Sequence, residues 1–166
     1  YYLALLYVNQ NKFFQAISYF EKAISRLSAD LGYYITAENG NDKIELADIY
    51  LKSGDHEESI KAFNSLLSRD HKNALILNNL AWAYLAAKNI KMALKTSKKA
   101  HLITPKSSTT LDTYGYMLLS NGDVQTALPL LQEAAKINPE NKGIQLRLAE
   151  AYLANKQNKK AITILI

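Results

Sequence analysis

The stretch Leu80-Ala81-Trp82-Ala83-Tyr84-Leu85 decides the fold, because close variants of it recur along the chain. Leu46–Leu51 and Leu148–Leu153 repeat the same order: a large residue, a small one, and Tyr three residues after the small one. A fourth copy, Tyr114–Leu119, differs by placing Leu at the Tyr position. The small residues of the four copies lie at one constant interval: Ala47, Ala81, Gly115 and Ala149. This fixed period of 34 residues predicts a repeated structural unit.

Other residues follow the same period. Small residues recur twelve positions later, again at the constant interval, at Ser59, Ala93, Ala127 and Ala161, and two further pairs of equal spacing are Ala100 with Ala134 and Pro105 with Pro139. We expect each unit to be two antiparallel helices whose small residues let the two backbones approach. Turn residues separate the two helices, and Asp55 and Asp123 are predicted to cap the second helices.

These residues and this period resemble the tetratricopeptide repeat family. The resemblance implies an all-α fold, a right-handed α-solenoid of stacked helix-turn-helix units. It predicts about three full repeats with a partial repeat at each end, in a single array over 1–166. The expected units are 1–30, 40–73, 74–107, 108–141 and 142–166. The sequence starts and stops inside helical patterns, so we expect it to be part of a longer protein.

The spacing between the first two units is longer than the period. Ala4 and Ala47 are separated by more than one period, which predicts an insertion of about nine residues at 31–39. One interpretation is a longer helix and loop that cover their own apolar surface. The other is a flap carrying Tyr33 and Tyr34 that reaches toward a binding groove. Asp42-Lys43-Ile44-Glu45 has the pattern of a capping box and predicts that a helix restarts there.

The composition excludes several classes of chemistry. The 166 residues include no cysteine, so disulfides, cysteine–zinc sites and thiol nucleophiles are excluded. The three histidines, His56, His71 and His101, lack the spacing of metal ligands, and the isolated glycines form no phosphate-binding loop. No apolar run is long enough for a transmembrane segment. We therefore expect a non-enzymatic protein without metal or cofactor.

The resemblance places a binding groove on the first helix of each unit. Two amphipathic aromatic residues, Trp82 and Tyr116, would come together there with Asn78 and Asp112, and an asparagine can both donate to and accept from a peptide backbone. The alternative is that the aromatic rings only pack between neighbouring helices. The family's clamp for chaperone tails needs Lys and Asn at these positions, which argues against that ligand. The candidate groove residues are Asn78, Asn79, Trp82, Leu85, Asp112, Thr113, Tyr116, Leu119, Arg147 and Glu150.

The positive charge is concentrated in one stretch. The chain has 20 Lys and Arg against 15 Asp and Glu, a net charge of +5, and Ala83 to Leu111 contains no acidic residue. Such a stripe predicts either an ordinary solvated helix face or a surface for a polyanion, that is, an acidic polysaccharide, anionic lipid or nucleic acid. Aromatic residues are missing from the stripe, so a stacking platform for single-stranded nucleic acid is not expected, and nucleic acid is the least expected of these polyanions. The candidate lysines are Lys88, Lys91, Lys95, Lys98 and Lys99, with Lys106 beyond them.

The leading hypothesis for function is a scaffold that binds a peptide or partner protein in the groove. The stretches Asn78–Tyr84 and Leu111–Tyr116 are similar to bacterial tetratricopeptide lipoproteins of exopolysaccharide export and PEP-CTERM protein sorting. That similarity implies an exported protein attached to the outer membrane, with a cytoplasmic location as the alternative. A third hypothesis is an accessory array that recruits substrate for a catalytic domain elsewhere in the protein. The apolar residues at both ends predict self-association.

Overall fold

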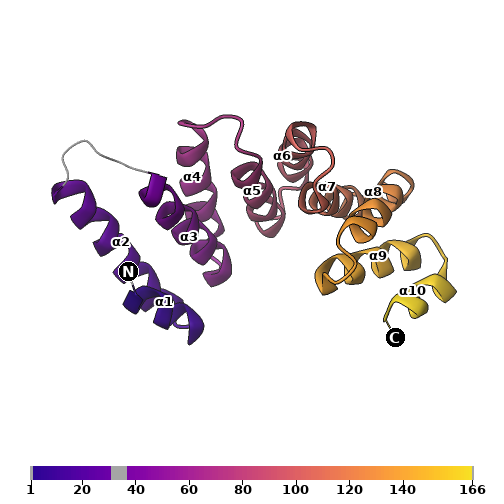
Figure 1. Ribbon diagram of the computed structural model, residues 1–166, viewed down its shortest axis with the longest axis horizontal. Coiled ribbons are helices and arrows are strands. Elements are labelled where there is room, and N and C mark those ends of the chain that lie inside the picture. The colour runs from indigo at the N-terminus through magenta and orange to yellow at the C-terminus, as the bar shows by residue number, and fades with distance from the viewer. Residues whose placement is uncertain (1, 31–36, 166) are drawn as a thin grey trace. The chain divides into compact units, whose positions relative to one another are not determined.

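A computed structural model describes residues 2–30 and 37–165, with side chains described over 2–25 and 43–164. All regular structure in these ranges is helical (Figure 1), which confirms the predicted all-α fold. Residues 31–36 lie outside the described residues, so the predicted flap with Tyr33 and Tyr34 stays a prediction. The helices are α1 (Tyr2–Asn9), α2 (Phe13–Asp30), α3 (Ala37–Ser53), α4 (His56–Leu67), α5 (Ala74–Ala86), α6 (Ile90–Ile103), α7 (Ser108–Ser120), α8 (Val124–Ile137), α9 (Lys142–Ala154) and α10 (Asn158–Leu165).

The helices belong to two compact units. Unit 1 is Tyr1–His71 and holds α1 to α4, and unit 2 is Lys72–Ile166 and holds α5 to α10. Within each unit every helix packs against the next one in the chain. In unit 2 the first helices of successive pairs also touch, α5 with α7 and α7 with α9. The starts of these three helices are separated by the same interval as the sequence repeat.

Small residues sit where the two helices of a pair meet, as the repeat predicts. Ala81 of α5 and Ala93 of α6 are fully buried. In the next pair a Cβ added to Gly115 would lie only 2.9 Å from Leu131 Cγ, so no larger residue fits without displacing its neighbour. In unit 1 the Ser59 hydroxyl donates to the Ala47 carbonyl oxygen at 2.8 Å. The small residues that recur with the period therefore allow the backbones of paired helices to approach closely.

The turn inside each pair has one residue in the left-handed backbone region. These residues are Asn11, Gly54, Lys88, Gly122 and Lys156, with φ between 56° and 93°. Glycine adopts this conformation without strain, whereas lysine does so at a cost. Before α4, α6 and α8 the next residue occupies the cap position of the second helix. Asp123 accepts a hydrogen bond there from the Thr126 amide, as predicted. Asp55 occupies the cap position of α4 but makes no capping bond there, and its Oδ2 accepts from the Ser53 hydroxyl.

The predicted capping box at 42–45 was wrong. α3 begins at Ala37, so Asp42 lies inside the helix and starts nothing. The helix runs through the capping pattern although Asn39-Gly40-Asn41-Asp42 are poor helix formers, so intrinsic propensity does not explain its early start.

Apolar side chains remain exposed near both ends of the described chain. Leu3 and Leu6 of α1 are 42% and 51% exposed, and Ile162 of α10 is 57% exposed. The predicted self-association through such residues stays a prediction. Among the described residues, no helix combines the length and the apolar character needed to cross a bilayer.

Candidate ligand-binding site

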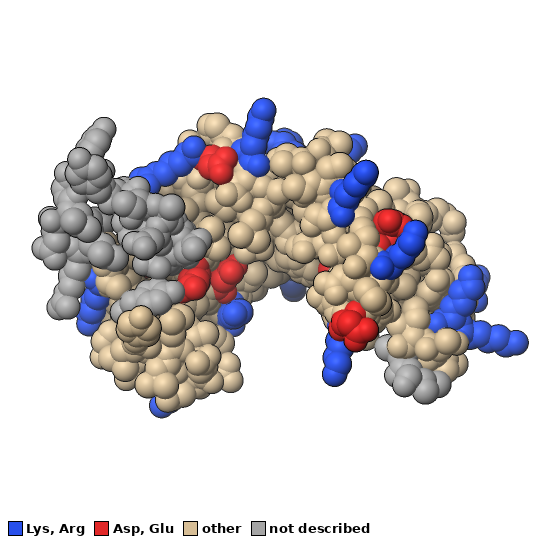
Figure 2. Space-filling view, viewed as in Figure 1, with Lys and Arg blue, Asp and Glu red and all other residues tan. Residues whose placement is uncertain are grey.

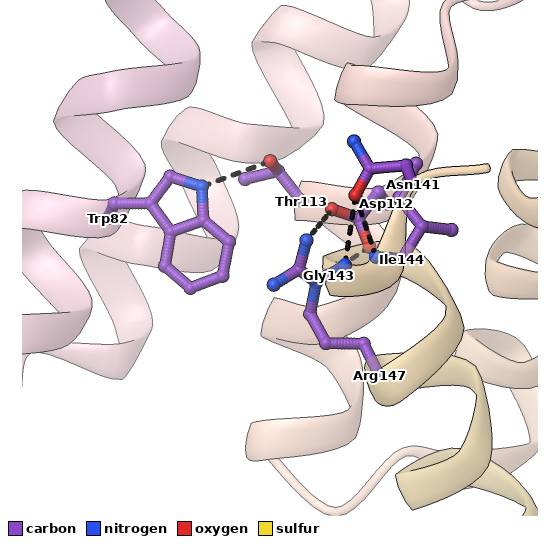
Figure 3. A network of polar contacts seen from close by, with 7 residues as sticks. All are labelled: Trp82, Asp112, Thr113, Asn141, Gly143, Ile144 and Arg147. Carbon is purple, nitrogen blue, oxygen red and sulfur yellow. Dashed lines mark hydrogen bonds and ion pairs between the residues drawn. The ribbon is translucent and has the colours of Figure 1, made fainter. Parts of the chain in front are cut away.

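An ion pair joins α7 to α9 in unit 2 (Figure 3). Arg147 Nε donates to Asp112 Oδ1 at 2.7 Å, and Arg147 Nη2 donates to Asp112 Oδ2 at 2.5 Å. The Asp112 side chain is 7% exposed and that of Arg147 is 23% exposed. A two-pronged contact of this kind fixes the orientation of both groups as well as their separation. The repeat spacing brings them together because α7 and α9 touch each other.

Two aromatic rings continue this network toward α5. The Trp82 ring of α5 stacks on the Tyr116 ring of α7, with centroids 5.4 Å apart and planes at 26°. The Arg147 guanidinium carbon lies 5.4 Å from the Trp82 ring and 5.8 Å from the Tyr116 ring, within the range of cation–π attraction. The Trp82 indole N–H donates to the Thr113 hydroxyl at 3.1 Å. The rings therefore do pack between neighbouring first helices, and their contact with a ligand stays a prediction.

A pocket of about 400 Å³ lies beside this network. Its volume falls within the range of about 300–1,000 Å³ that is typical of small-ligand sites. Both apolar and polar groups line it, and Asn141 at its edge is exposed. The lining residues are Asn78, Trp82, Thr109, Asp112, Thr113, Asn141, Ile144 and Arg147.

Asn78 is the one lining residue in the described chain with a buried polar atom that has no partner. Its side chain belongs to α5 and the residue is 4% exposed. Its Oδ1 is shielded from solvent and accepts no hydrogen bond from the described residues. Buried carbonyl oxygens are nearly always paired in native proteins, because an unpaired one loses its hydration without compensation.

The structure brings half of the predicted groove residues into this pocket: Asn78, Trp82, Asp112, Thr113 and Arg147. Tyr116 contacts the pocket only through Trp82 and Arg147. The others are outside the lining. Leu85 and Leu119 pack against the buried clusters of unit 2, and Asn79 and Glu150 are half-buried elsewhere on the first helices.

Sequence reasoning missed three lining residues, Thr109, Asn141 and Ile144. Asn141 caps α9 by accepting from the amides of Gly143 and Ile144, and it follows Asn73 and Ser107 at the period of the repeat. That recurrence was visible in the sequence. The sequence did not reveal that the start of α9 lines the pocket, because this depends on the offset between the first helices of successive pairs.

The lysine stripe, which has Lys88 in the turn before α6 and its other four residues on α6, is exposed as predicted. All five residues, Lys88, Lys91, Lys95, Lys98 and Lys99, are on the surface, and none forms an ion pair with a residue that the structure describes. Unit 2 as a whole has 13 Lys and Arg against 5 Asp and Glu. Figure 2 shows basic side chains projecting from this part of the molecule with fewer acidic ones among them. The positive charge is thus a property of unit 2.

Two titratable groups outside the pocket have shifted pKa values. Burial lowers the pKa of the His101 imidazole, whose ring stacks on Tyr114 and whose Nδ1 has no partner among the described residues. In unit 1, burial and then the hydrogen bond to Glu21 raise the pKa of the Tyr50 phenol. Neither group faces a cluster that could hold a metal, since the described residues contain no group of three or more suitable ligands.

Comparisons with known proteins agree with this fold. Residues 1–26, 44–100 and 118–166 each match a sequence family described as tetratricopeptide repeat. A thermophilic TPR protein from Thermus thermophilus is 20% identical with a TM-score of 0.78, over 98% of this chain and 84% of that one. A tetratricopeptide repeat protein from Parabacteroides merdae ATCC 43184 is 18% identical with a TM-score of 0.73, over 98% and 62%. MamA from Desulfovibrio magneticus RS-1 is 13% identical with a TM-score of 0.72, over 98% and 87%. Likeness at these identities shows the fold alone.

Proposed function

The chain belongs to the tetratricopeptide repeat family, whose repeats mediate protein–protein interactions, and we propose that it is a non-catalytic scaffold that binds a peptide segment of a partner protein. We place the binding site on the face of unit 2 formed by α5, α7 and α9. The observation that carries this proposal is the pocket between these helices, which combines ring surface, a paired charge and an unused acceptor.

The physical chemistry of the pocket supports a ligand of this kind. Trp82 and Tyr116 offer large apolar contact areas with few torsions to restrict, which is why such residues dominate binding energy at interfaces. Their positions are fixed before binding, because Arg147 and Thr113 already hold the Trp82 ring. A ligand would therefore bind without the entropy cost of ordering these groups.

A binding experiment with two variants tests the proposal. The bait is the chain itself, used to capture partners from a native lysate and peptides from a random display library. The Trp82→Ala/Tyr116→Ala double variant should lose the captured peptides and partners, once circular dichroism has shown that it is folded. The Lys91→Glu/Lys95→Glu/Lys98→Glu triple variant should retain them. Ligands that the aromatic variant retains in full would place the site elsewhere and overturn the proposal.

A second candidate function rests on the lysine stripe of α6. Five exposed cations without ion-pair partners among the described residues, on a unit with 13 basic and 5 acidic residues, could bind an acidic polysaccharide, an anionic lipid surface or a nucleic acid. The affinity of such binding would fall steeply as salt rises, because roughly one counterion is released for each phosphate that a lysine neutralises. Unchanged binding of heparin, anionic vesicles and DNA by the triple Glu variant would refute this candidate.

A finer assignment follows from the local similarity of Asn78–Tyr84 and Leu111–Tyr116 to bacterial arrays. It makes the protein an assembly factor in bacterial exopolysaccharide export or protein sorting, exported and attached to the outer membrane. Fractionation of cells expressing the full-length protein tests it, and recovery in the cytoplasm would refute it. A catalytic domain in the full-length protein would instead favour the role of a substrate-recruiting accessory.

A further inference from the structure

The chemistry of the pocket is set by which of its acceptors are already used. Asp112 accepts from Arg147 through both oxygens, Thr113 Oγ1 accepts from the Trp82 indole, and Asn141 Oδ1 accepts from two amides at the start of α9. Asn78 Oδ1 accepts nothing from the described residues. Asn78, a residue of the pocket lining, thus has a buried acceptor without a donor, and a ligand N–H supplies that donor only once the Asn78 amide turns toward the pocket.

The charges in the pocket limit what the ligand can be. Asp112 and Arg147 neutralise each other in a two-pronged contact, so no unpaired charge faces the ligand from the described lining residues. A carboxylate on the ligand would meet the oxygens of Asn78 and Asp112. It would also find Arg147, which has N–H groups beyond the two that Asp112 accepts, already neutralised by Asp112. An ammonium or guanidinium group would compete with Arg147 for Asp112 and for the ring of Trp82. A neutral group that donates hydrogen bonds meets neither obstacle.

We propose, building on the proposed function, that the pocket of α5, α7 and α9 selects a neutral amide whose N–H donates to Asn78 Oδ1. The amide plane packs beside the Trp82 ring, and its carbonyl oxygen faces the exposed edge of the pocket. Asn78 Oδ1 is shielded in the structure described, so the ligand reaches it through a rotation about the terminal Asn78 torsion, which is broad for asparagine. The amide is either a peptide unit of the partner's backbone or the primary carboxamide of a Gln or Asn side chain.

Four small probes separate these chemistries. Propionamide represents a primary carboxamide and N-methylacetamide a backbone amide, whereas propionate and n-propylammonium match their size and carry opposite charges. Trp82 is the sole tryptophan of the chain, so its indole N–H gives a single, unambiguous NMR signal beside the pocket. We expect at least one amide probe to shift this signal saturably. Propionate has no donor and should bind about fivefold or more weakly at equal ionic strength, as loss of one net hydrogen bond predicts. n-Propylammonium should also bind more weakly than the amides, because it competes with Arg147 for Asp112.

Two variants of Asn78 assign the selectivity to that residue. Asn78→Leu has a similar volume and no acceptor, so it should bind the amide probes about fivefold more weakly. Asn78→Asp retains the acceptor and adds a negative charge, so n-propylammonium should become the preferred probe. Asn158→Asp adds the same charge on α10, outside the pocket, and should leave the preference unchanged. Thermal unfolding checks that each variant is folded.

The result that overturns amide selection is equal or tighter binding of propionate or of n-propylammonium, or amide binding that Asn78→Leu leaves intact. If peptide binding still depends on Trp82 in that case, the proposed scaffold function stands and only the amide assignment is removed. A Trp82 signal that none of the four probes moves would also overturn amide selection. Preference for propionamide over N-methylacetamide identifies a side-chain amide, and the reverse identifies the partner's backbone.

Discussion

Replacing Arg147 with Met should destabilise unit 2 far more than an ordinary surface substitution. The change removes both hydrogen bonds to Asp112, whose side chain is 7% exposed, and leaves that carboxylate buried without a cation. Loss of one partner from a buried pair costs about 3–5 kcal/mol. Arg147 is 23% exposed, so water can replace part of the interaction, and we expect a loss of about 2–4 kcal/mol.

A double-mutant cycle separates the pair from its surroundings. Asp112→Asn removes the charge but retains an acceptor for Arg147, and should cost about 1–2 kcal/mol. With both substitutions no unpaired charge is buried, so the double variant should be more stable than the sum of the two losses predicts. The expected coupling is about 2 kcal/mol.

Trp82 makes the measurement direct, because its fluorescence reports on unit 2 alone. Urea titrations followed by that signal give the free energy of unfolding of each variant by linear extrapolation. Lys142→Met is the matched control, since it removes one exposed cation from the start of α9 and should change stability by less than about 0.5 kcal/mol. A loss below about 1 kcal/mol for Arg147→Met, or additive losses in the cycle, would refute the account of the ion pair.

Three further predictions concern turns, packing and pH. Lys88→Gly and Lys156→Gly relieve a left-handed backbone at φ 59° and should each raise the free energy of unfolding by up to about 1 kcal/mol in urea titrations; a loss would mean that the turn is not strained. Gly115→Ala places a Cβ 2.9 Å from Leu131 Cγ and should cost about 1–3 kcal/mol, measured as a lower melting temperature. The lowered pKa of His101 means that the unfolded chain takes up a proton before the folded one, so stability should fall as pH drops through the usual value of 6.5. His101→Gln should remove that part of the pH dependence, and an unchanged pH profile would contradict the assignment.

The repeat period was sufficient to predict the helix pairs. The buried small residues at Ala81, Ala93 and Gly115 are the physical reason, because only small side chains let paired helices approach this closely. The exact start of α3 was not predictable from the capping pattern at 42–45. Helix extension competes with capping there, and the intrinsic propensities of the residues before it do not explain why extension prevails.

The candidate site was predicted in part. Asn78, Trp82, Asp112 and Arg147 were chosen from their register on the first helices, and the structure gathers all four around one pocket. The two-pronged pairing of Arg147 with Asp112 could not be derived, because the residues are 35 positions apart and their contact depends on the offset between α7 and α9. The unpaired oxygen of Asn78 could not be derived either, since an unmet hydrogen bond is a property of the packed surroundings.

The most direct test of the account is the ¹⁵N spectrum of the chain during titration with the tightest peptide selected from a random library. Binding at the pocket of unit 2 should produce saturable shifts of the Trp82 indole N–H and the Arg147 Nε–H signals, because both residues line that pocket. Calorimetry on the same samples shows independently whether the peptide binds. Saturable binding that leaves both signals in place, with shifts confined to α6, would contradict the account and place the partner on the lysine stripe.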